Sequence, residues 1–370
     1  MLTQFQVSGY KNLPDTPIEL GRVTVLIGAN NSGKTNLLRA MTLLEDAIVD
    51  PTAAFQAHGG LRVVPYAIAS QARYMSHAVT LAKVCDRGSR HVEFRYDGRH
   101  DRWWLASDRL SINMPTADGG QTFEREVAAA RPDDTPTLST TNDAWPDDFM
   151  AAMGRRLFLC RLFRTATFDN DAARQMRPWA IRSELDLDGI ELAALVKGIE
   201  QDVDDLARPE RLWKMVAEAF QLPVARPLRV QDFGTTTNLQ LELIRPGAAV
   251  PLADLSDGSI QMLRLACWAS GQSRILIDEP ELHLHPAWAR LAARWILQSR
   301  AQFVLATHSP ELLDGLTAGL ADGTVRLVVL GVDGTVTQPS ADLLAKRMEN
   351  GWELGDLFRG GEPDLGGWPW

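Results

Sequence analysis

The chain has 370 residues, a length that suits one large α/β domain or a core with a sizeable insertion. Because 45% of the residues are hydrophobic and 23% are charged, the composition is that of a folded globular protein and excludes disordered, collagen-like and coiled-coil chains. The net charge of -9 argues against a nucleic-acid binder that acts through its overall field, although a local basic face is still compatible with it.

The sequence carries no membrane or secretion signal. No run of about 18 apolar residues could form a membrane helix, and the first residues lack the basic and apolar regions of a signal peptide. Cys85, Cys160 and Cys267 are far apart and form no CxxC pair, which argues against a disulfide framework and a zinc site. We therefore expect a cytoplasmic protein with buried thiols and no membrane partner.

The first fifty residues begin in a strand pattern and end in a helix pattern. Residues 2–7 predict a strand, and residues 22–27, rich in β-branched side chains, predict a buried strand that runs directly into a glycine loop. A helix is expected from Lys34 to about Ile48. The glycine loop therefore stands between a buried strand and the start of a helix.

The middle of the chain is less regular. Strands are expected at residues 78–84, 91–96 and 102–105, whereas residues 113–148, rich in Asp, Thr and Pro, predict an exposed loop. Helical spacing returns between residues 189 and 220 in two apolar stripes. The stripes are Leu192, Leu195, Val196 and Ile199, then Leu212, Met215, Val216 and Phe220.

The last third alternates strands with helices, as in a mainly parallel, three-layer α/β sheet. The expected strands are residues 239–244, 274–277, 303–306 and 325–330. The final twenty residues are rich in Gly, Trp and Pro. Within them, the apolar spacing of residues 352–358 suits either docking to a partner or packing on the domain's own helices.

Residues 28–35, Gly-Ala-Asn-Asn-Ser-Gly-Lys-Thr, fit the pattern GxxxxGK[ST] of a phosphate-binding loop. Backbone N–H groups would hold the β-phosphate, Lys34 would neutralise the β- and γ-oxygens, and the Thr35 hydroxyl would ligate Mg²⁺. The alternative, a glycine-rich turn with a surface lysine, fits the flanking strand and helix less well. The candidate nucleotide-binding residues are Asn30, Asn31, Ser32, Gly33, Lys34 and Thr35.

An apolar strand pattern at residues 274–277 ends in two carboxylates, Asp278 and Glu279. Asp278 is placed to hold Mg²⁺ through its waters, and Glu279 to polarise the water that attacks the γ-phosphate. The alternative is an ordinary acidic pair at the end of a strand.

A second apolar strand pattern ends in Thr307-His308-Ser309-Pro310. A histidine in isolation is usually structural, but beside the other two strand ends His308 is predicted to hydrogen-bond the γ-phosphate. His283 and His285 stand two residues apart and could suggest zinc, but no third ligand is identifiable.

Residues 255–261, Leu-Ser-Asp-Gly-Ser-Ile-Gln, are expected to open a helix before the Asp278 strand. Ser256 and Gly258 at that helix N-terminus would form a second phosphate-binding surface. Since Lys34 already serves the nucleotide within its own subunit, two anion sites imply two subunits.

Five motifs in this order resemble the ABC-type ATPase heads of the RecF/SMC/Rad50 and OLD-like class, within the stand-alone AAA-family ATPases of prokaryotes. They are residues 5–13, 28–35, 255–261, 278–286 and 307–310. The resemblance implies an α/β fold: a P-loop NTPase of the ABC-ATPase type, built as a three-layer sandwich with an inserted α/β lobe and no long coiled coil. It also implies ATP and Mg²⁺ as cofactors.

The resemblance assigns a role to each matching residue. Lys34, Glu279 and His308 would be catalytic, and Thr35 and Asp278 would serve the metal. Ser256 and Gly258 would reach across a head-to-tail dimer to the partner's ATP, and residues 282–286 would lie where the family's D-loop contacts the other subunit. The glutamine that other heads place between Mg²⁺ and water has only Gln71 and Gln175 as candidates.

We expect one ATPase domain with a core lobe at residues 1–49 and 225–335, an insertion at 50–224 and a tail at 336–370. The insertion has neither the length nor the heptads of an SMC or Rad50 coiled coil. The residues after Pro310 show no acidic constellation like the Toprim domain of OLD nucleases, so we expect that the chain alone does not cut DNA.

The leading hypothesis is an ATP-driven homodimer, acting in phage defence with a separately encoded effector such as a nuclease; the effector is an analogy with similar ATPases. The alternative is a RecF-like repair clamp that binds duplex DNA directly. A transporter subunit is disfavoured by the LSDGS signature, and a non-hydrolysing scaffold by the presence of Glu279. Two groups of arginines are candidates for contacting DNA, and each could equally be a solvated helix face. The first group is Arg155, Arg156, Arg161 and Arg164, and the second is Arg174, Arg177 and Arg182.

Overall fold

The computed structural model describes residues 1–47, 51–58, 77–98, 100–116, 119–129, 137–140, 153, 157–164, 177–178, 192–232, 238–349, 351–362 and 365. The chain packs into two compact units. Unit 1 comprises residues 1–162, 326–339 and 363–370, and unit 2 comprises residues 163–325 and 340–362. The division into core lobe, insertion and tail stays a prediction. Among the described residues, every helix is too short or too polar to cross a membrane.

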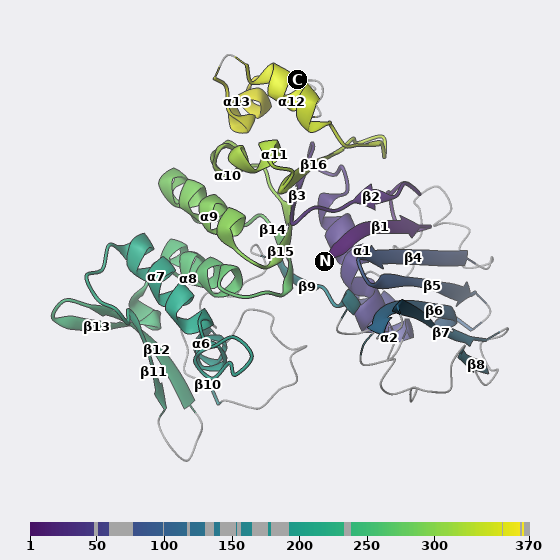
Figure 1. Ribbon diagram of the computed structural model, residues 1–370, viewed down its shortest axis with the longest axis horizontal. Helices are drawn as coiled ribbons and strands as arrows, with labels where there is room; N and C mark the ends of the chain where they lie inside the picture. Colours follow the sequence, from purple (N-terminus) through teal and green to yellow (C-terminus); the bar gives the residue numbers. More distant parts are fainter. Residues whose placement is uncertain are drawn as a thin grey trace. The chain divides into compact units, whose positions relative to one another are not determined.

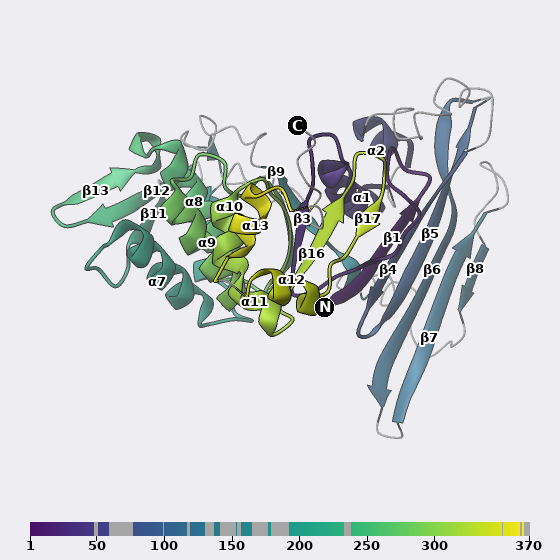
Figure 2. The same cartoon turned by 90° about the horizontal axis from the view of Figure 1, so that it is seen from above.

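Unit 1 contains a seven-stranded antiparallel sheet, seen in Figures 1 and 2. Its order is β2 (Ile18–Glu19), β1 (Leu2–Ser8), β4 (His77–Cys85), β5 (Gly88–Asp97), β6 (Arg102–Thr116), β7 (Gly119–Ala128) and β8 (Thr137–Thr140). Helix α2 (Pro51–Ala57) packs on this sheet through Phe55, which stacks on Trp103 at 3.9 Å between ring centroids. The predicted strands at residues 2–7, 78–84, 91–96 and 102–105 are confirmed.

The loop predicted at residues 113–148 is wrong in part, because β6 continues to Thr116 and is followed by β7 and β8. Register explains the difference: all of β7 pairs with residues 107–116 of β6, and the buried side chains of Ile112 and Phe123 lie opposite each other. Cross-strand pairing of this kind stabilises strands whose local sequence is polar.

The phosphate-loop strand of unit 1 is β3 (Val23–Ile27), in which every residue is buried. It leads through residues 28–33 into α1 (Lys34–Ala47), as predicted. Within this unit β3 neighbours β16 (Val325–Leu330), which pairs antiparallel with β17 (Val336–Thr337). The glycine loop thus begins at the carboxyl end of a buried strand.

In unit 2, β14 (Arg274–Asp278) and β15 (Gln302–Ala306) run parallel, with Asp278 opposite Ala306. Helices α8 (Asp257–Ala269), α9 (Pro286–Gln298) and α10 (Pro310–Leu316) begin with N-caps Ser256, His285 and Ser309. Each cap side chain accepts a backbone N–H of the first turn, and α9 and α10 also carry proline at their first position. Helix α10 is followed by α11 (Ala318–Ala321).

The predicted helical region at 189–220 forms two helices, α6 (Leu192–Glu200) and α7 (Arg208–Phe220). Their apolar stripes bury Leu192, Val196 and Ile199, then Leu212 and Val216. The strand predicted at 239–244 is β12 (Asn238–Arg245), but it lies in a separate antiparallel sheet. Its neighbours are β10 (Arg177–Pro178), β11 (Leu228–Asp232) and β13 (Ala248–Pro251), and a 3₁₀ turn, η4 (Leu252–Asp254), leads to the signature segment.

The tail forms α12 (Ala341–Arg347) and α13 (Leu354–Arg359), and α13 packs against α10 (Figure 1). Leu354, Leu357 and Phe358 are buried, so these tail residues pack on the domain's own helices rather than remain open for docking. The prediction of buried thiols is confirmed, since all three cysteines are free and buried.

Candidate nucleotide site

The predicted site residues fall into two groups, one in each compact unit. Unit 1 holds the phosphate loop, and unit 2 holds Asp278, Glu279, His308, Ser256 and Gly258. All residues of a group therefore lie within the same unit.

The backbone of the phosphate loop requires its glycines. Gly28 and Gly33 have φ of +142° and +106°, a region that side chains disfavour. A Cβ on Gly28 would lie 2.2 Å from the carbonyl oxygen of Leu330 on β16. Asn31 has φ of 66°, in the left-handed region that asparagine tolerates better than most residues. The loop therefore has the tight turn that an anion-binding cradle needs.

The polar groups of the loop fit a phosphate. Lys34 Nζ donates to the carbonyl oxygens of Gly28 and Ala29, both at 2.9 Å, which folds the ammonium group over the loop. Ser32 is 1% exposed, and its hydroxyl is buried without a hydrogen-bond partner. Since a buried hydroxyl normally has a partner, this one is suited to a ligand oxygen. Asn30 and Asn31 are exposed, and Thr35 lies in the first turn of α1.

The turn after β1 is hydrogen-bonded to the phosphate loop and to α1. Asn12 Nδ2 donates to the Asn31 carbonyl at 3.2 Å, and Asn36 Nδ2 donates to Asn12 Oδ1 at 2.8 Å. Lys11 Nζ also donates to Asn36, at 3.2 Å. Sequence reasoning did not assign a role to Asn12 or Asn36, although Asn12 stands in the first of the five motifs.

Strands β14 and β15 of unit 2 are parallel and end in register. Their carboxyl ends therefore place Asp278 and Glu279 beside the Thr307–His308 pair. The Glu279 N–H donates to the Ala306 carbonyl at 2.8 Å. Glu279 also has φ of 56°, a left-handed conformation that costs energy for a residue with a side chain. Such a conformation sets the direction in which the Glu279 side chain leaves the strand end.

Glu281 fixes the position of the His308 turn, a role that sequence reasoning missed. Its Oε1 accepts from the His308 N–H at 2.9 Å and from Thr307 Oγ1 at 2.8 Å, while Oε2 is buried without a hydrogen-bond partner. Burial raises the pKa of Glu281 above its usual range, and the hydrogen bonds from His308 and Thr307 oppose that rise. The acidic motif 278–281 was the available signal.

The signature residues contact the segment after the acidic pair. A Cβ on Gly258 would lie 2.6 Å from the His283 carbonyl oxygen, and Gln261 Nε2 donates to the Pro280 carbonyl at 3.2 Å. Ser256 is exposed and caps α8 by accepting from the Ser259 N–H at 3.3 Å. The start of α8 and residues 280–283 therefore form one continuous part of unit 2.

His285 has a structural role, since its Nδ1 accepts from the Ala287 N–H at 3.2 Å at the start of α9. Among the described residues, no group of three or more His, Cys, Asp and Glu side chains gathers in a way that would hold a metal ion. A site made by Thr35 and Asp278 alone is smaller than such a group and stays a prediction.

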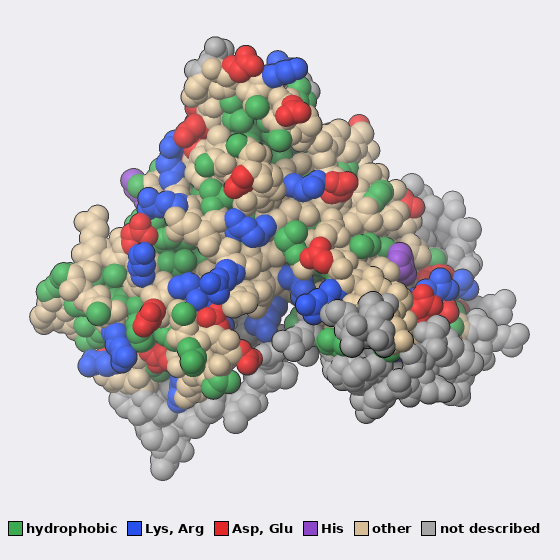
Figure 3. Space-filling model, in the orientation of Figure 1, with side chains coloured by type: hydrophobic (Ala, Val, Ile, Leu, Met, Phe, Trp, Pro, Cys, Tyr) green, Lys and Arg blue, Asp and Glu red, His purple; other side chains and the backbone are tan. Residues whose placement is uncertain are grey.

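The candidate DNA-contacting arginines lie largely outside the described residues, as do both glutamine candidates, Gln71 and Gln175. Arg161 and Arg164 lie on β9 (Arg161–Arg164), and Arg177 lies on β10; Arg155, Arg156, Arg174 and Arg182 are not described. On the face shown in Figure 3, positive and negative side chains are interspersed over the helices of unit 2.

Two family models match the chain. One, described as "AAA domain, putative AbiEii toxin, Type IV TA system", matches residues 174–314, and another, described as "AAA ATPase domain", matches residues 1–59. A curated protein, the retron Vc95 probable ATPase of Vibrio cholerae serotype O1 biovar El Tor, is 28% identical over 125 residues. That match covers 29% of this chain and 24% of the relative, so the chain spans about a quarter of the relative's length.

Solved structures of SMC heads share the fold. An SMC head bound to the C-winged helix domain of ScpA aligns with a TM-score of 0.52 and 14% identity, over 94% of this chain and 99% of that one. An SMC head with an extended coiled coil, bound to the C-terminal domain of ScpA derived from Pyrococcus furiosus, aligns with a TM-score of 0.53 and 13% identity, over 94% and 98%. The family models and the shared fold together confirm the resemblance seen in the sequence: parts of the chain match models of AAA-family ATPases, and the chain has the α/β fold of an SMC head.

Proposed function

We propose that the chain binds and hydrolyses ATP, and that ATP drives the head-to-tail pairing of two copies. The observation that carries the proposal is the phosphate loop, where Gly28 and Gly33 adopt positive φ, Lys34 folds back over the loop and the buried Ser32 hydroxyl has no hydrogen-bond partner. The family models and the retron ATPase support the same activity.

In the proposed reaction, Lys34 neutralises the β- and γ-phosphate oxygens, and Glu279 accepts a proton from the attacking water. The water oxygen then bonds to the γ-phosphorus, the bond from that phosphorus to the β–γ bridging oxygen breaks, and ADP leaves with that oxygen. His308 hydrogen-bonds the transferring group. A Mg²⁺ ion held by Thr35 and, through water, by Asp278 would supply charge neutralisation at the phosphates.

Pairing would complete the site, because we propose that Ser256 and Gly258 serve the nucleotide of the other copy. Within one copy, Gly258 lies close to the His283 carbonyl, so binding at the signature helix would act on the segment that follows Glu279. The opening and closing of the dimer would be the output of ATP turnover.

We further propose that this output controls a separately encoded effector, such as a nuclease, in phage defence. The partial similarity to a retron ATPase supports this part of the proposal. Direct binding of duplex DNA, as in a repair clamp, is the alternative, and the next experiment separates the two.

The test compares the wild type with Lys34→Ala and Glu279→Gln. Lys34→Ala should abolish nucleotide binding, whereas Glu279→Gln should bind ATP, lose on the order of 10²–10⁴-fold in kcat and accumulate as a dimer. Nucleotide binding, steady-state hydrolysis and light scattering with ATP measure these outcomes.

Glu210→Gln, a change of the same kind at an exposed position of α7, is the matched control and should behave as the wild type. Wild-type turnover by Glu279→Gln would contradict the assignment of the base. Linear duplex DNA is the second arm: stimulation of hydrolysis would favour the DNA clamp, and indifference would favour a protein effector.

A further inference from the structure

The C-terminal helix α13 contacts the helix that follows His308. The Leu354 N–H donates to Thr317 Oγ1 at 3.0 Å, and α13 buries Leu354, Leu357 and Phe358. A Cβ on Gly355 would lie 2.2 Å from both Asp314 Oδ1 and the Pro310 carbonyl oxygen. Gly355 therefore lets the backbone of α13 approach the Pro310 carbonyl and the Asp314 carboxylate of α10 closely.

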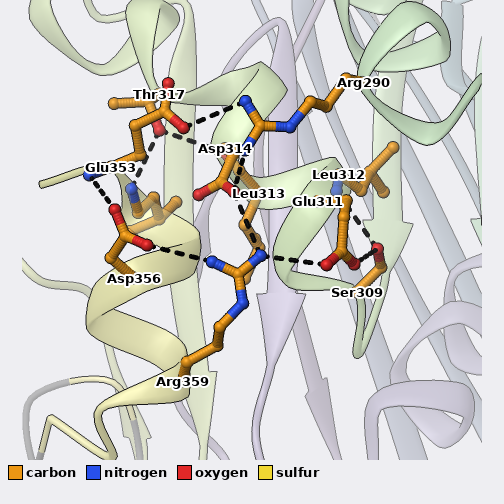
Figure 4. Close-up of polar contacts among 11 residues, drawn as sticks. Arg290, Ser309, Glu311, Leu312, Leu313, Asp314, Thr317, Glu353, Asp356 and Arg359 are labelled. Atoms are coloured by element: carbon orange, nitrogen blue, oxygen red, sulfur yellow. Dashed lines mark hydrogen bonds and ion pairs between the residues drawn. The ribbon is translucent and has the colours of Figure 1, made fainter. Parts of the chain in front are cut away.

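Asp314 of α10 is the centre of a charged cluster drawn in Figure 4. Its side chain is 0% exposed, and its Oδ2 accepts from Arg290 of α9 at 2.7 Å and from Arg359 of α13 at 3.3 Å. A buried carboxylate needs such partners, since an unpaired buried charge is costly. Asp314 thus joins three helices through one carboxylate.

Arg359 also reaches the first turn of α10. Its Nη2 donates to Glu311 Oε1 at 3.0 Å, and Ser309 Oγ donates to Glu311 Oε2 at 3.2 Å (Figure 4). Partial burial works against ionisation of Glu311, but its own backbone N–H and the hydrogen bonds from Arg359 and Ser309 lower its pKa overall. The Glu311 carboxylate therefore stays charged and links Arg359 to the residue directly after His308.

The other side of the same turn is bound by Glu281, which accepts from the His308 N–H and from Thr307 Oγ1. The Ser309 N–H in turn donates to Thr307 Oγ1 at 3.0 Å. The acidic motif therefore holds the His308 backbone directly through Glu281, whereas the tail reaches the Ser309 side chain through Arg359 and Glu311.

We propose that α13 is a positioning element for the His308 turn and that Arg359 is its positioning residue. The proposal rests on the role of His308 in the proposed ATP hydrolysis. Arg359 is 41% exposed, and exposed ion pairs add little to global stability, so its contribution is expected in the local order of the turn.

Arg359→Gln is the central variant, and Arg359→Lys keeps the charge but loses the planar, forked geometry of the guanidinium. Arg294→Gln is the matched control, because Arg294 is similarly exposed and makes an ion pair at 2.7 Å with Glu218 of α7, which is not part of α10 or α13. Hydrogen exchange of the amides of residues 308–313, among which Pro310 has no N–H, is the first measurement, made without nucleotide.

We expect these amides to exchange on the order of tenfold faster in Arg359→Gln, the size of effect that one charge-assisted hydrogen bond supplies. Arg359→Lys should fall between Arg359→Gln and the wild type, and Arg294→Gln should match the wild type. In steady-state hydrolysis, kcat of Arg359→Gln should fall by about the same factor with an unchanged Kd for ATP.

The outcomes separate the two proposals. Wild-type exchange at residues 308–313 in Arg359→Gln overturns the role of α13, and so does faster exchange with an unchanged kcat. If the wild type binds ATP but does not hydrolyse it, the proposed function fails and takes the kinetic role of Arg359 with it. If the wild type hydrolyses ATP and Arg359→Gln has the same kcat, only the positioning role of Arg359 is contradicted.

Discussion

A single carboxylate, that of Glu281, holds the His308 turn to the strand end that carries Asp278 and Glu279. It accepts two hydrogen bonds on one oxygen, and its second oxygen is buried without a partner. Burying a carboxylate in this way is costly, and burial accordingly raises the pKa of Glu281. Removing the Glu281 side chain should therefore destabilise the protein more than removing only its charge.

Replacing Glu281 with alanine or with glutamine separates these two effects. Alanine leaves the His308 N–H and the Thr307 hydroxyl without their acceptor, which should cost about 1–3 kcal/mol of unfolding free energy. Glutamine keeps an oxygen acceptor and removes the buried charge, so its unfolding free energy should stay within about 1 kcal/mol of the wild type.

Urea unfolding checks both values, and kcat at saturating ATP should fall only in Glu281→Ala. Equal losses in stability and kcat for the two variants would show that the carboxylate charge, not the acceptor, is what matters.

At the scale of elements, the loop between α6 and α7 is tied to the end of α8, the helix that begins at the signature. Asp205 accepts from Arg211 Nη1 at 3.1 Å and from Gln272 at 2.9 Å, and Arg211 Nε donates to the Ser270 carbonyl at 3.1 Å. The hydrogen bond from Arg211 lowers the pKa of Asp205 to about 2, against partial burial. Asp205 is therefore charged in the folded protein at a pH where it would be protonated in the unfolded chain.

This shift predicts a defined pH window. A carboxylate with a lowered folded pKa contributes stability above its unfolded pKa of 3.8 and loses it as the pH falls to about 2. Near pH 6 the unfolding free energy of the wild type should exceed that of Asp205→Asn by about 1 kcal/mol, after allowance for solvent screening. The difference between the two proteins should vanish as the pH falls from about 4 to about 2.

Urea melts of both proteins across this range measure the difference, and Asp204→Asn, at an exposed neighbouring position, is the control. A difference that persists unchanged at pH 2 would mean that Asp205 acts through packing and not through its charge.

The elements that the sequence predicted are those with a strong local pattern. The buried run of β3, the glycine loop after it and the apolar strands β14 and β15 needed no knowledge of their neighbours. Strand β7, Gly-Gly-Gln-Thr-Phe-Glu-Arg-Glu-Val-Ala, has weak local preference and is defined by its pairing with β6, which a sequence pattern does not reveal.

The same reasoning explains which parts of the candidate site were found. The phosphate loop, the acidic pair and His308 stand in short motifs, and their chemistry follows from residue type and spacing. Glu281 and Arg359 act through partners at positions 307–308 and 311–314, contacts between segments that lie apart in the sequence. Predicting such partners requires the packing of α13 on α10, whereas the apolar spacing of residues 352–358 suggested packing on the domain's own helices only as one of two alternatives.

For the whole molecule, the decisive question is whether one ATP site is built from two copies. Lys34 lies in unit 1 and Ser256 in unit 2, and the proposed dimer pairs the phosphate loop of one copy with the signature of the other. In a head-to-tail pair the two sites are equivalent, so a defect in either motif inactivates both sites of a homodimer. Ser256→Arg should therefore be as inactive as Lys34→Ala, although each change leaves the other motif intact.

Mixing these two inactive variants is the sharpest consequence of the dimer. In a mixed pair, one site carries both defects and the other site carries neither. The site without defects should hydrolyse ATP. With random exchange at equal amounts, half of the pairs are mixed, and total activity should recover to about a quarter of that of the wild type. Steady-state hydrolysis by the mixture measures this recovery. The control mixes Lys34→Ala with a double variant that carries both Lys34→Ala and Ser256→Arg, because no pair in that mixture has an intact site. A mixture without recovery, in which a tagged Lys34→Ala copy co-purifies with Ser256→Arg in the presence of ATP and so shows that mixed pairs form, would show that Ser256 does not complete the site of another copy.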